Sequence, residues 1–110
     1  MTSVDAREFY VGELRRAVNE QRFGVAEIGD VSLSVPPGSP GAIVHIRLLE
    51  DKMIKVKLNL DGYRVVSLGS ASRGRKFETI EGLLELESPV WNQRRMEILM
   101  SKLSRIAEAQ

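Results

Sequence analysis

The chain contains no cysteine and a single histidine among its 110 residues. The lack of cysteine excludes disulfide bonds, catalytic thiolates and cysteine-based metal sites. The one histidine, His45, has no second imidazole with which to share a metal and no candidate nucleophile beside it. We therefore expect no catalytic residue, no metal site and no cofactor, and we interpret the protein as something other than an enzyme.

Aromatic residues are also scarce, at 5% of the chain, and charge of either sign is not in excess. The 16 Lys and Arg residues against 15 Asp and Glu give a net charge of +1, so no overall field favours a nucleic acid. No apolar run reaches the roughly 18 residues that a membrane-spanning helix needs. The first residues lack the pattern of a secretion signal. We expect a single domain over residues 1–110, in the cytoplasm, with neither nucleic acid nor membrane as a partner.

The first two thirds of the chain predict a helix followed by a sheet. Helical spacing of apolar residues covers residues 5–23 and stops at Gly24. Alternating apolar and polar residues then predict strands at residues 31–35, 44–48, 54–60 and 63–68. Asp61-Gly62 is a strong signal for a tight hairpin turn between the last two of these strands.

The last third predicts two helices. A short one carries Phe77, Ile80, Leu83 and Leu84 on its buried side. A longer one covers residues 89–107, with Ser88 as its N-cap and proline in the first helical position. Its expected core stripe is Met96, Leu99, Leu103 and Ile106. The fold class is therefore α+β: an N-terminal helix, an antiparallel meander of three or four strands, and two C-terminal helices packed on one face of the sheet.

The final helix has more apolar residues than one core stripe needs. Trp91 and Ile98 lie outside that stripe, and the basic residues around them are Arg94, Arg95, Lys102 and Arg105. Apolar anchors ringed by arginine are typical of a helix that binds a groove on a partner protein. The alternative interpretation is that Trp91 closes the edge of the core, and the sequence does not decide between the two.

The loop at residues 69–76 reads G-x-x-x-x-G-R-K between a strand and a helix. A phosphate-binding loop would have lysine and a hydroxyl residue where this chain has Arg75 and Lys76, and it would follow a strand of a parallel sheet. We therefore favour a basic loop whose Arg73, Arg75 and Lys76 are able to contact an acidic or phosphorylated partner. A phosphate or nucleotide site in residues 69–76 is the less favoured alternative.

Several short segments, in order and spacing, resemble the GSKIP family of glycogen synthase kinase-3 interaction proteins. They are Ala17-Val18-Asn19 with Phe23, Leu58-Asn59-Leu60 with Gly62, Arg64-Val65-Val66, Lys76-Phe77-Glu78-Thr79-Ile80, Leu83-Leu84 with Leu86, Ser88-Pro89 with Trp91, and Leu99 with Leu103. The likeness covers most of the chain, although each segment alone is weak. The sequence departs from the family pattern at Asn92 and Arg95, where the family tends to have arginine and phenylalanine.

The resemblance implies a protein that binds the kinase with its last helix. Leu103 lies where the family has its main kinase-contacting leucine, and Leu99 lies one turn earlier. The predicted partner-binding set is therefore Trp91, Arg94, Arg95, Ile98, Leu99, Lys102 and Leu103. Some family members also anchor the regulatory subunit of cyclic-AMP-dependent protein kinase through the first helix. We expect no such anchoring here because Arg15 and Arg16 interrupt the apolar stripe.

The favoured function is thus that of a non-catalytic protein that binds, and thereby inhibits, a kinase of the glycogen synthase kinase-3 type. The alternative is a scaffold domain of the same fold with a different protein partner.

Overall fold

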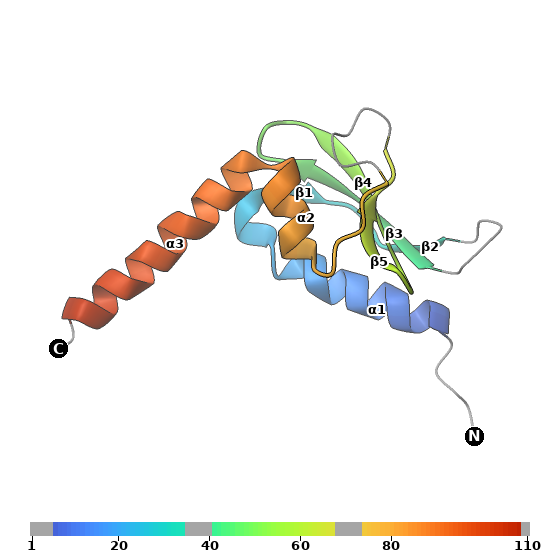
Figure 1. Ribbon diagram of the computed structural model, residues 1–110, viewed down its shortest axis with the longest axis horizontal. Coiled ribbons are helices and arrows are strands. Elements are labelled where there is room, and N and C mark those ends of the chain that lie inside the picture. The colour runs from blue at the N-terminus through green and yellow to red at the C-terminus, as the bar shows by residue number, and fades with distance from the viewer. Residues whose placement is uncertain (1–5, 35–40, 68–73, 109–110) are drawn as a thin grey trace, which may run out of the picture.

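The computed structural model describes residues 6–34, 41–67 and 74–108 (Figure 1). The predicted basic loop therefore lies outside the described residues except for its last three positions. The elements in chain order are α1 (Ala6–Asn19), η1 (Arg22–Gly24, a 3₁₀ turn), β1 (Val25–Ile28), β2 (Ser32–Ser34), β3 (Gly41–Leu48), β4 (Met53–Asn59), β5 (Gly62–Val65), α2 (Ile80–Glu87) and α3 (Pro89–Glu108).

The five strands form one antiparallel sheet, which confirms the α+β fold class. Its order is β1-β3-β4-β5, and β2 pairs with the first half of β3. The strand β1 was not predicted. It contains only four residues and pairs with β3 through a register shift between Val25 and Glu27. A bulge of this kind interrupts the strict alternation by which strands are recognised.

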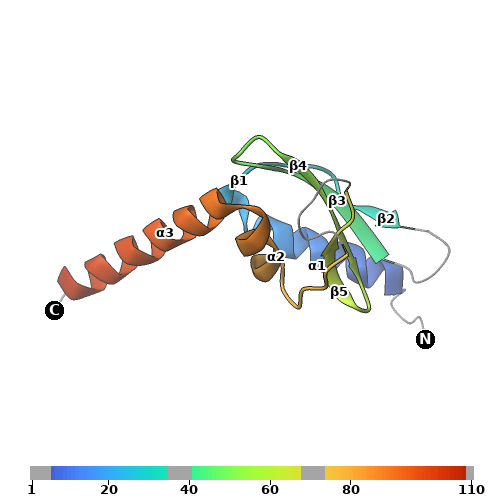
Figure 2. The same ribbon diagram turned by 45° about the horizontal axis from the view of Figure 1, so that its top comes forward.

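One face of the sheet supplies most of the core. Val44, Ile46 and Leu48 of β3 are buried there, as are Ile54, Val56 and Leu58 of β4. The helix α1 lies against β3 and contributes Leu14, Ala17 and Val18, and α2 contacts β5 and contributes Ile80, Leu83 and Leu84. Figure 2 shows both helices on the same side of the sheet. Alternating residues of β3 and β4 therefore point either into this core or to the opposite, open face.

The β4–β5 hairpin differs by one residue from the predicted turn. Asn59 pairs with Gly62, so Leu60 and Asp61 are the two loop residues. Leu60 is 83% exposed although its position in the alternation predicted burial. The Asn59 side-chain oxygen accepts a hydrogen bond from the Asp61 backbone N–H (2.9 Å), and Gly62 adopts a φ of +112°, which favours glycine.

The last helix corrects the sequence prediction most clearly. Its predicted start is confirmed, since α3 begins at Pro89. Beyond its first turns, however, α3 points away from the domain, and its main contacts are with α2 and η1 and not with the sheet (Figures 1 and 2). The predicted core stripe is wrong, because all four of its members are about half exposed: Met96, Leu99, Leu103 and Ile106.

Candidate functional site

The start of α3 is held to the domain by a buried tryptophan. Trp91 has no exposed surface, and its indole Nε1 donates a hydrogen bond to the Gln21 side-chain oxygen (3.2 Å). The Gln21 amide nitrogen in turn donates to a Glu81 carboxylate oxygen (3.1 Å), which joins α2 to the end of α1. Phe23 packs against the indole with 6.1 Å between ring centroids. Of the two interpretations of Trp91, the structure supports the one that places it in the core.

The N-terminus of α3 is also capped from two sides. The Ser88 hydroxyl accepts a hydrogen bond from the Trp91 backbone N–H (3.0 Å) and donates one to Glu50 (2.7 Å). The other Glu50 oxygen accepts the Val90 backbone N–H (3.0 Å). Partial burial acts to raise the pKa of Glu50, but the bonds from Val90 and Ser88 outweigh it and hold the pKa below its ordinary value. A carboxylate at a helix N-terminus is favoured by the free N–H groups there.

A second contact fixes the same junction. Lys52, in the β3–β4 turn, forms an ion pair of 3.2 Å with Glu87, whose side chain is fully buried at the end of α2. Lys52 and Glu50 thus connect one turn of the sheet to both sides of the α2–α3 junction. The direction in which α3 leaves the domain is consequently set by side-chain contacts on both sides of Ser88.

Beyond this junction α3 displays an apolar surface that we call the exposed strip. Each of its residues is between 47% and 57% exposed: Met96, Leu99, Met100, Leu103 and Ile106. Their spacing puts them on one side of the helix. Leu103 follows Trp91 by twelve residues, which at 100° per residue turns it about 120° away from the side that faces the domain. Most of the strip therefore faces away from the described part of the domain.

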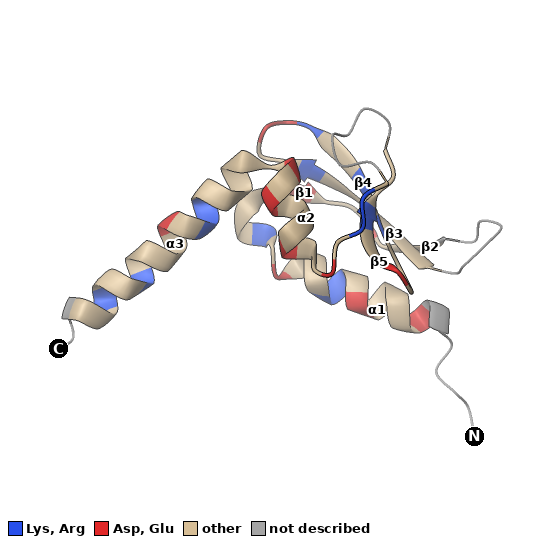
Figure 3. Cartoon of the chain, in the orientation of Figure 1, with Lys and Arg blue, Asp and Glu red and all other residues tan. Residues whose placement is uncertain are grey.

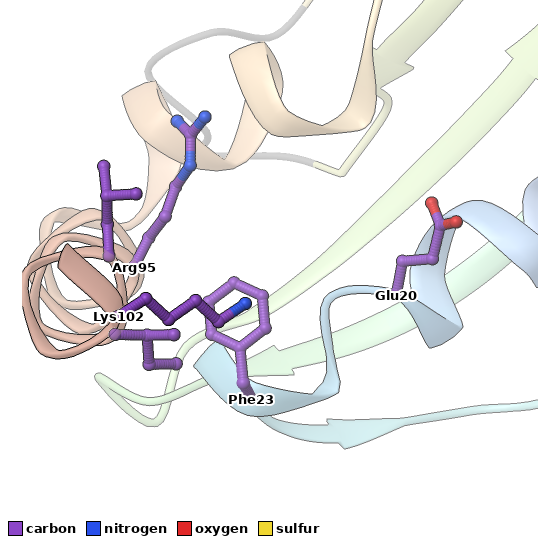
Figure 4. Close-up of a pocket in the computed structure, with 6 residues that line it drawn as sticks. Glu20, Phe23, Arg95 and Lys102 are labelled. Atoms are coloured by element: carbon purple, nitrogen blue, oxygen red, sulfur yellow. The ribbon is translucent and has the colours of Figure 1, made fainter. Parts of the chain in front are cut away.

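A hollow of about 390 Å³ lies between α3 and the end of α1 (Figure 4). It is lined by Glu20, Phe23, Arg95, Ile98, Leu99 and Lys102. Phe23 is 40% exposed and forms the apolar wall opposite the helix. Arg95 stacks over the Trp91 ring at 5.5 Å. Position 95 is one at which the sequence departs from the GSKIP family pattern, which tends to have phenylalanine there. In this chain a charged group therefore contacts the indole from that position.

Four basic residues lie on α3: Arg94, Arg95, Lys102 and Arg105. Arg95 and Lys102 line the hollow and border the exposed strip, whereas helical spacing puts Arg94 and Arg105 on the opposite side of α3. Figure 3 shows basic residues spaced along the projecting helix. Within the part of the chain that the structure describes, none of them forms an ion pair. The charges of Arg95 and Lys102 therefore lie along one edge of the exposed strip without being neutralised by the domain.

All seven predicted site residues lie on α3. Six of them have exposed or half-buried side chains, and the seventh, Trp91, is buried. The sequence prediction missed four residues. Met96 and Ile106 were assigned to the core, and Met100 was assigned no role. Phe23 was placed only at the end of the first helix, and no local pattern indicates that it reaches α3.

The other candidate sites are simpler. His45 lies exposed on the open face of the sheet, as predicted. Among the described residues, no three side chains of the metal-binding types come together. No described helix is long and apolar enough to span a bilayer. Of the phosphate-loop candidate only Gly74, Arg75 and Lys76 are described, and Arg75 stacks over the Phe77 ring at 5.4 Å.

The fold and the exposed strip together define a class of protein: a small α+β domain with a projecting helix whose apolar side is exposed. Comparison with known families identifies the family within this class, since the model of the GSKIP domain matches residues 11–106. The chain belongs to the GSKIP domain family, a family of glycogen synthase kinase-3 interaction proteins and not a known enzyme family. No curated protein and no solved structure gave a significant match.

Proposed function

We propose that this protein binds a kinase of the glycogen synthase kinase-3 type through the exposed strip of α3. The observation that carries the proposal is the strip itself: five large apolar side chains on one side of a helix, each about half exposed. Single exposed apolar residues are ordinary, but a contiguous set of this kind marks an interaction surface. Family membership supplies the class of partner.

The binding mode that the geometry favours is a helix in an apolar groove. Apolar residues at positions i, i+3, i+4 and i+7 are the usual anchors of such complexes, and Met96, Leu99, Met100 and Leu103 have this spacing. Leu99 and Leu103 are the central pair, because the other strip residues lie on either side of them. Arg95 and Lys102, which border the strip, would meet acidic groups at the rim of the groove, where they influence association rate and orientation more than affinity.

The proposed mechanism is occupation of the groove, with no bond made or broken by this chain. A kinase whose groove is filled is closed to other proteins that dock there, so binding inhibits phosphorylation of substrates that depend on the groove. We also propose a cytoplasmic location, where this protein would meet such a kinase. The scaffold alternative remains: another protein would then occupy the same strip.

We further propose that α1 does not anchor the cyclic-AMP-dependent kinase. Leu14, Ala17 and Val18 of α1 are buried against the sheet, so they are not accessible to a docking domain. Arg16 is exposed and forms ion pairs with Glu13 (2.6 Å) and Glu20 (3.1 Å) on the same helix. The accessible surface around these residues is therefore charged, which disfavours an apolar groove.

The test is a titration of purified full-length protein with the purified kinase, using Leu103→Glu and a matched control. Ser101→Glu adds the same charge two residues earlier, about 200° around the helix. Removing a leucine from an interface and leaving a charge there should weaken binding by about 1.5–3 kcal/mol or more, or at least roughly tenfold. Ser101→Glu should bind within about twofold of wild type, since an exposed substitution away from the interface changes little.

Both variants should unfold in urea as the wild type does, because residues 101 and 103 are exposed. Kinase binding by wild type that Leu103→Glu leaves intact would refute the role of the strip. No measurable kinase binding by wild type would refute the proposed partner and favour the scaffold alternative.

A further inference from the structure

The open face of the sheet carries a cluster of cations that the fold does not require. Outward-facing positions of β3, β4 and β5 hold the members of what we call the basic face, which also includes the segment before α2: His45, Lys55, Lys57, Arg64 and Lys76. Figure 3 shows basic residues along β4, β5 and the following segment. The chain has a net charge of only +1, so this concentration is local.

Strand register places two of these cations directly side by side, because Lys57 is opposite Arg64. His45 is opposite Lys55. Tyr63 bridges to Phe77 with hydrogen bonds in both directions (2.9 and 2.8 Å), which puts Lys76 next to Arg64 on the outer side. Like charges directly across a sheet destabilise it. The free protein therefore maintains an unfavourable arrangement that a negatively charged ligand would relieve.

The domain itself neutralises this face only at its margins. Arg47, at the β1 side, pairs with Glu27 (3.7 Å) and Asp51 (3.6 Å), and Asp61 approaches Arg64 at 3.6 Å. Within the described part of the chain, Lys55, Lys57 and Lys76 form no ion pair. The Nε of Arg64 is buried there without a hydrogen-bond partner. Three ammonium groups without an ion pair thus remain available beside Arg64.

The neighbouring side chains indicate what kind of anion fits. Ile43, Met53 and Val66 share the outer face, and Met53 is 52% exposed. None of the six aromatic residues of the chain lies on this face, because Tyr63 and Phe77 pack against the core and the others belong to α1, η1 and α3. Single-stranded nucleic acids bind such surfaces largely by stacking bases on aromatic rings. Carboxylates interspersed with aliphatic side chains complement this face better.

We propose that the basic face binds an acidic, aliphatic-containing segment of a partner protein. Carboxylates of that segment pair with Lys55, Lys57 and Lys76, and its aliphatic side chains pack on Ile43, Met53 and Val66. The basic face and the exposed strip have no residue in common. A kinase bound to α3 and an acidic segment bound to the sheet would therefore not compete for the same side chains.

The experiment is a fluorescence anisotropy titration of the full chain with labelled peptides. The probe is a peptide of Glu-Glu-Ile repeats, and its controls are Lys-Lys-Ile and Glu-Glu-Ser repeats of equal length. Oligothymidine and vesicles containing phosphatidylserine test the other anionic partners. We expect Glu-Glu-Ile to bind best, with affinity that falls at least tenfold when salt rises from about 0.05 to about 0.5 M, since exposed ion pairs are screened. Lys-Lys-Ile should not bind.

Variants locate the site and separate binding from folding. Lys55→Glu with Lys57→Glu should lower affinity for Glu-Glu-Ile by at least about tenfold, because two attractions become repulsions. The same double variant places a carboxylate across from Arg64, so its thermal midpoint should be unchanged or higher. The matched control, Arg94→Glu with Arg105→Glu on α3, changes the net charge equally and should bind the peptide as the wild type does. Leu103→Glu should also retain peptide binding, even if the proposed kinase interaction fails.

Three results would overturn the inference. The first is equal or tighter binding of oligothymidine or vesicles than of Glu-Glu-Ile, which would assign the face to another class of partner. The second is an equal loss of peptide binding in the Arg94→Glu, Arg105→Glu control, which would show that net charge alone accounts for the effect. The third is an absence of Glu-Glu-Ile binding at low salt, which would show that the basic face lacks affinity for acidic segments.

Discussion

Alanine substitution of Leu99 distinguishes a displayed helix from a packed one. If Leu99 were part of the core, its replacement by alanine would leave a cavity and cost about 2–5 kcal/mol of unfolding free energy. In the structure Leu99 is 47% exposed. Complete burial of a leucine contributes about 1.5–3 kcal/mol, so half of it, about 0.75–1.5 kcal/mol, sets the upper limit on the loss. Alanine recovers a few tenths of a kcal/mol in helix propensity, which leaves an expected cost of about 0.5–1.2 kcal/mol.

Trp91 provides the comparison within the same helix. It is fully buried, it packs against Phe23, and it donates a hydrogen bond to Gln21. Trp91→Ala should therefore cost about 3–5 kcal/mol, a large share of the roughly 5–15 kcal/mol that stabilises an ordinary domain. Urea denaturation of both variants, followed by far-ultraviolet circular dichroism, measures the two losses. A loss of 2 kcal/mol or more for Leu99→Ala would mean, on the range expected for core leucines, that α3 folds back onto the domain in solution.

Three further substitutions examine the α3 junction. Ser88→Ala removes the N-cap and a donor to Glu50, and should cost about 1–2 kcal/mol in urea denaturation; a loss below about 0.3 kcal/mol would contradict the cap. Because folding lowers the pKa of Glu50, its stabilising effect is present above the ordinary value of 4.5 and is lost as pH falls through the folded-state value. Wild type should therefore lose stability from about pH 5 to about pH 3 more steeply than Glu50→Gln, and parallel curves would refute this linkage. Gly24→Ala should cost about 1–3 kcal/mol and shift the tryptophan fluorescence, since a methyl group there overlaps the Trp91 ring, whereas the control Gly12→Ala, whose methyl meets no atom within 4 Å, should be neutral or stabilising. An equal effect of the two alanines would contradict the close approach at Gly24.

Much of the sheet was predictable because one of its faces is buried. Val44, Ile46 and Leu48 alternate with exposed residues, and this period of two is visible without any tertiary information. The predicted position of the β4–β5 turn was wrong by one residue. Asp61-Gly62 occurs most often as the pair of loop residues, but here Gly62 is the first residue of β5 and the Asn59 side chain closes the turn. The tertiary bridge between Tyr63 and Phe77 favours this register, and no local pattern reports it.

The sequence predicted the candidate site on the last helix, where the exposed strip lies, but it assigned most of the strip to the core. Helical periodicity shows that Met96, Leu99 and Leu103 share one side, and it shows nothing about what covers that side. A stripe that packs on its own domain and a stripe that packs on another protein have the same spacing. Trp91 was equally ambiguous, because its burial depends on Gln21 and Phe23, about 70 residues earlier in the chain.

The structure resolves this ambiguity because only the first part of α3 contacts the domain. A helix of 20 residues is about 30 Å long, and the domain covers only its beginning. Isolated helices gain little stability in water, so the exposed part of α3 depends on the turn fixed by Trp91 and capped by Ser88. A partner that binds the exposed strip meets a helix already started in the right direction, and it is spared part of the entropic cost of ordering it. On the proposed function, the buried tryptophan would support binding without touching the partner, because it holds Leu99 and Leu103 in a helix that projects from the domain.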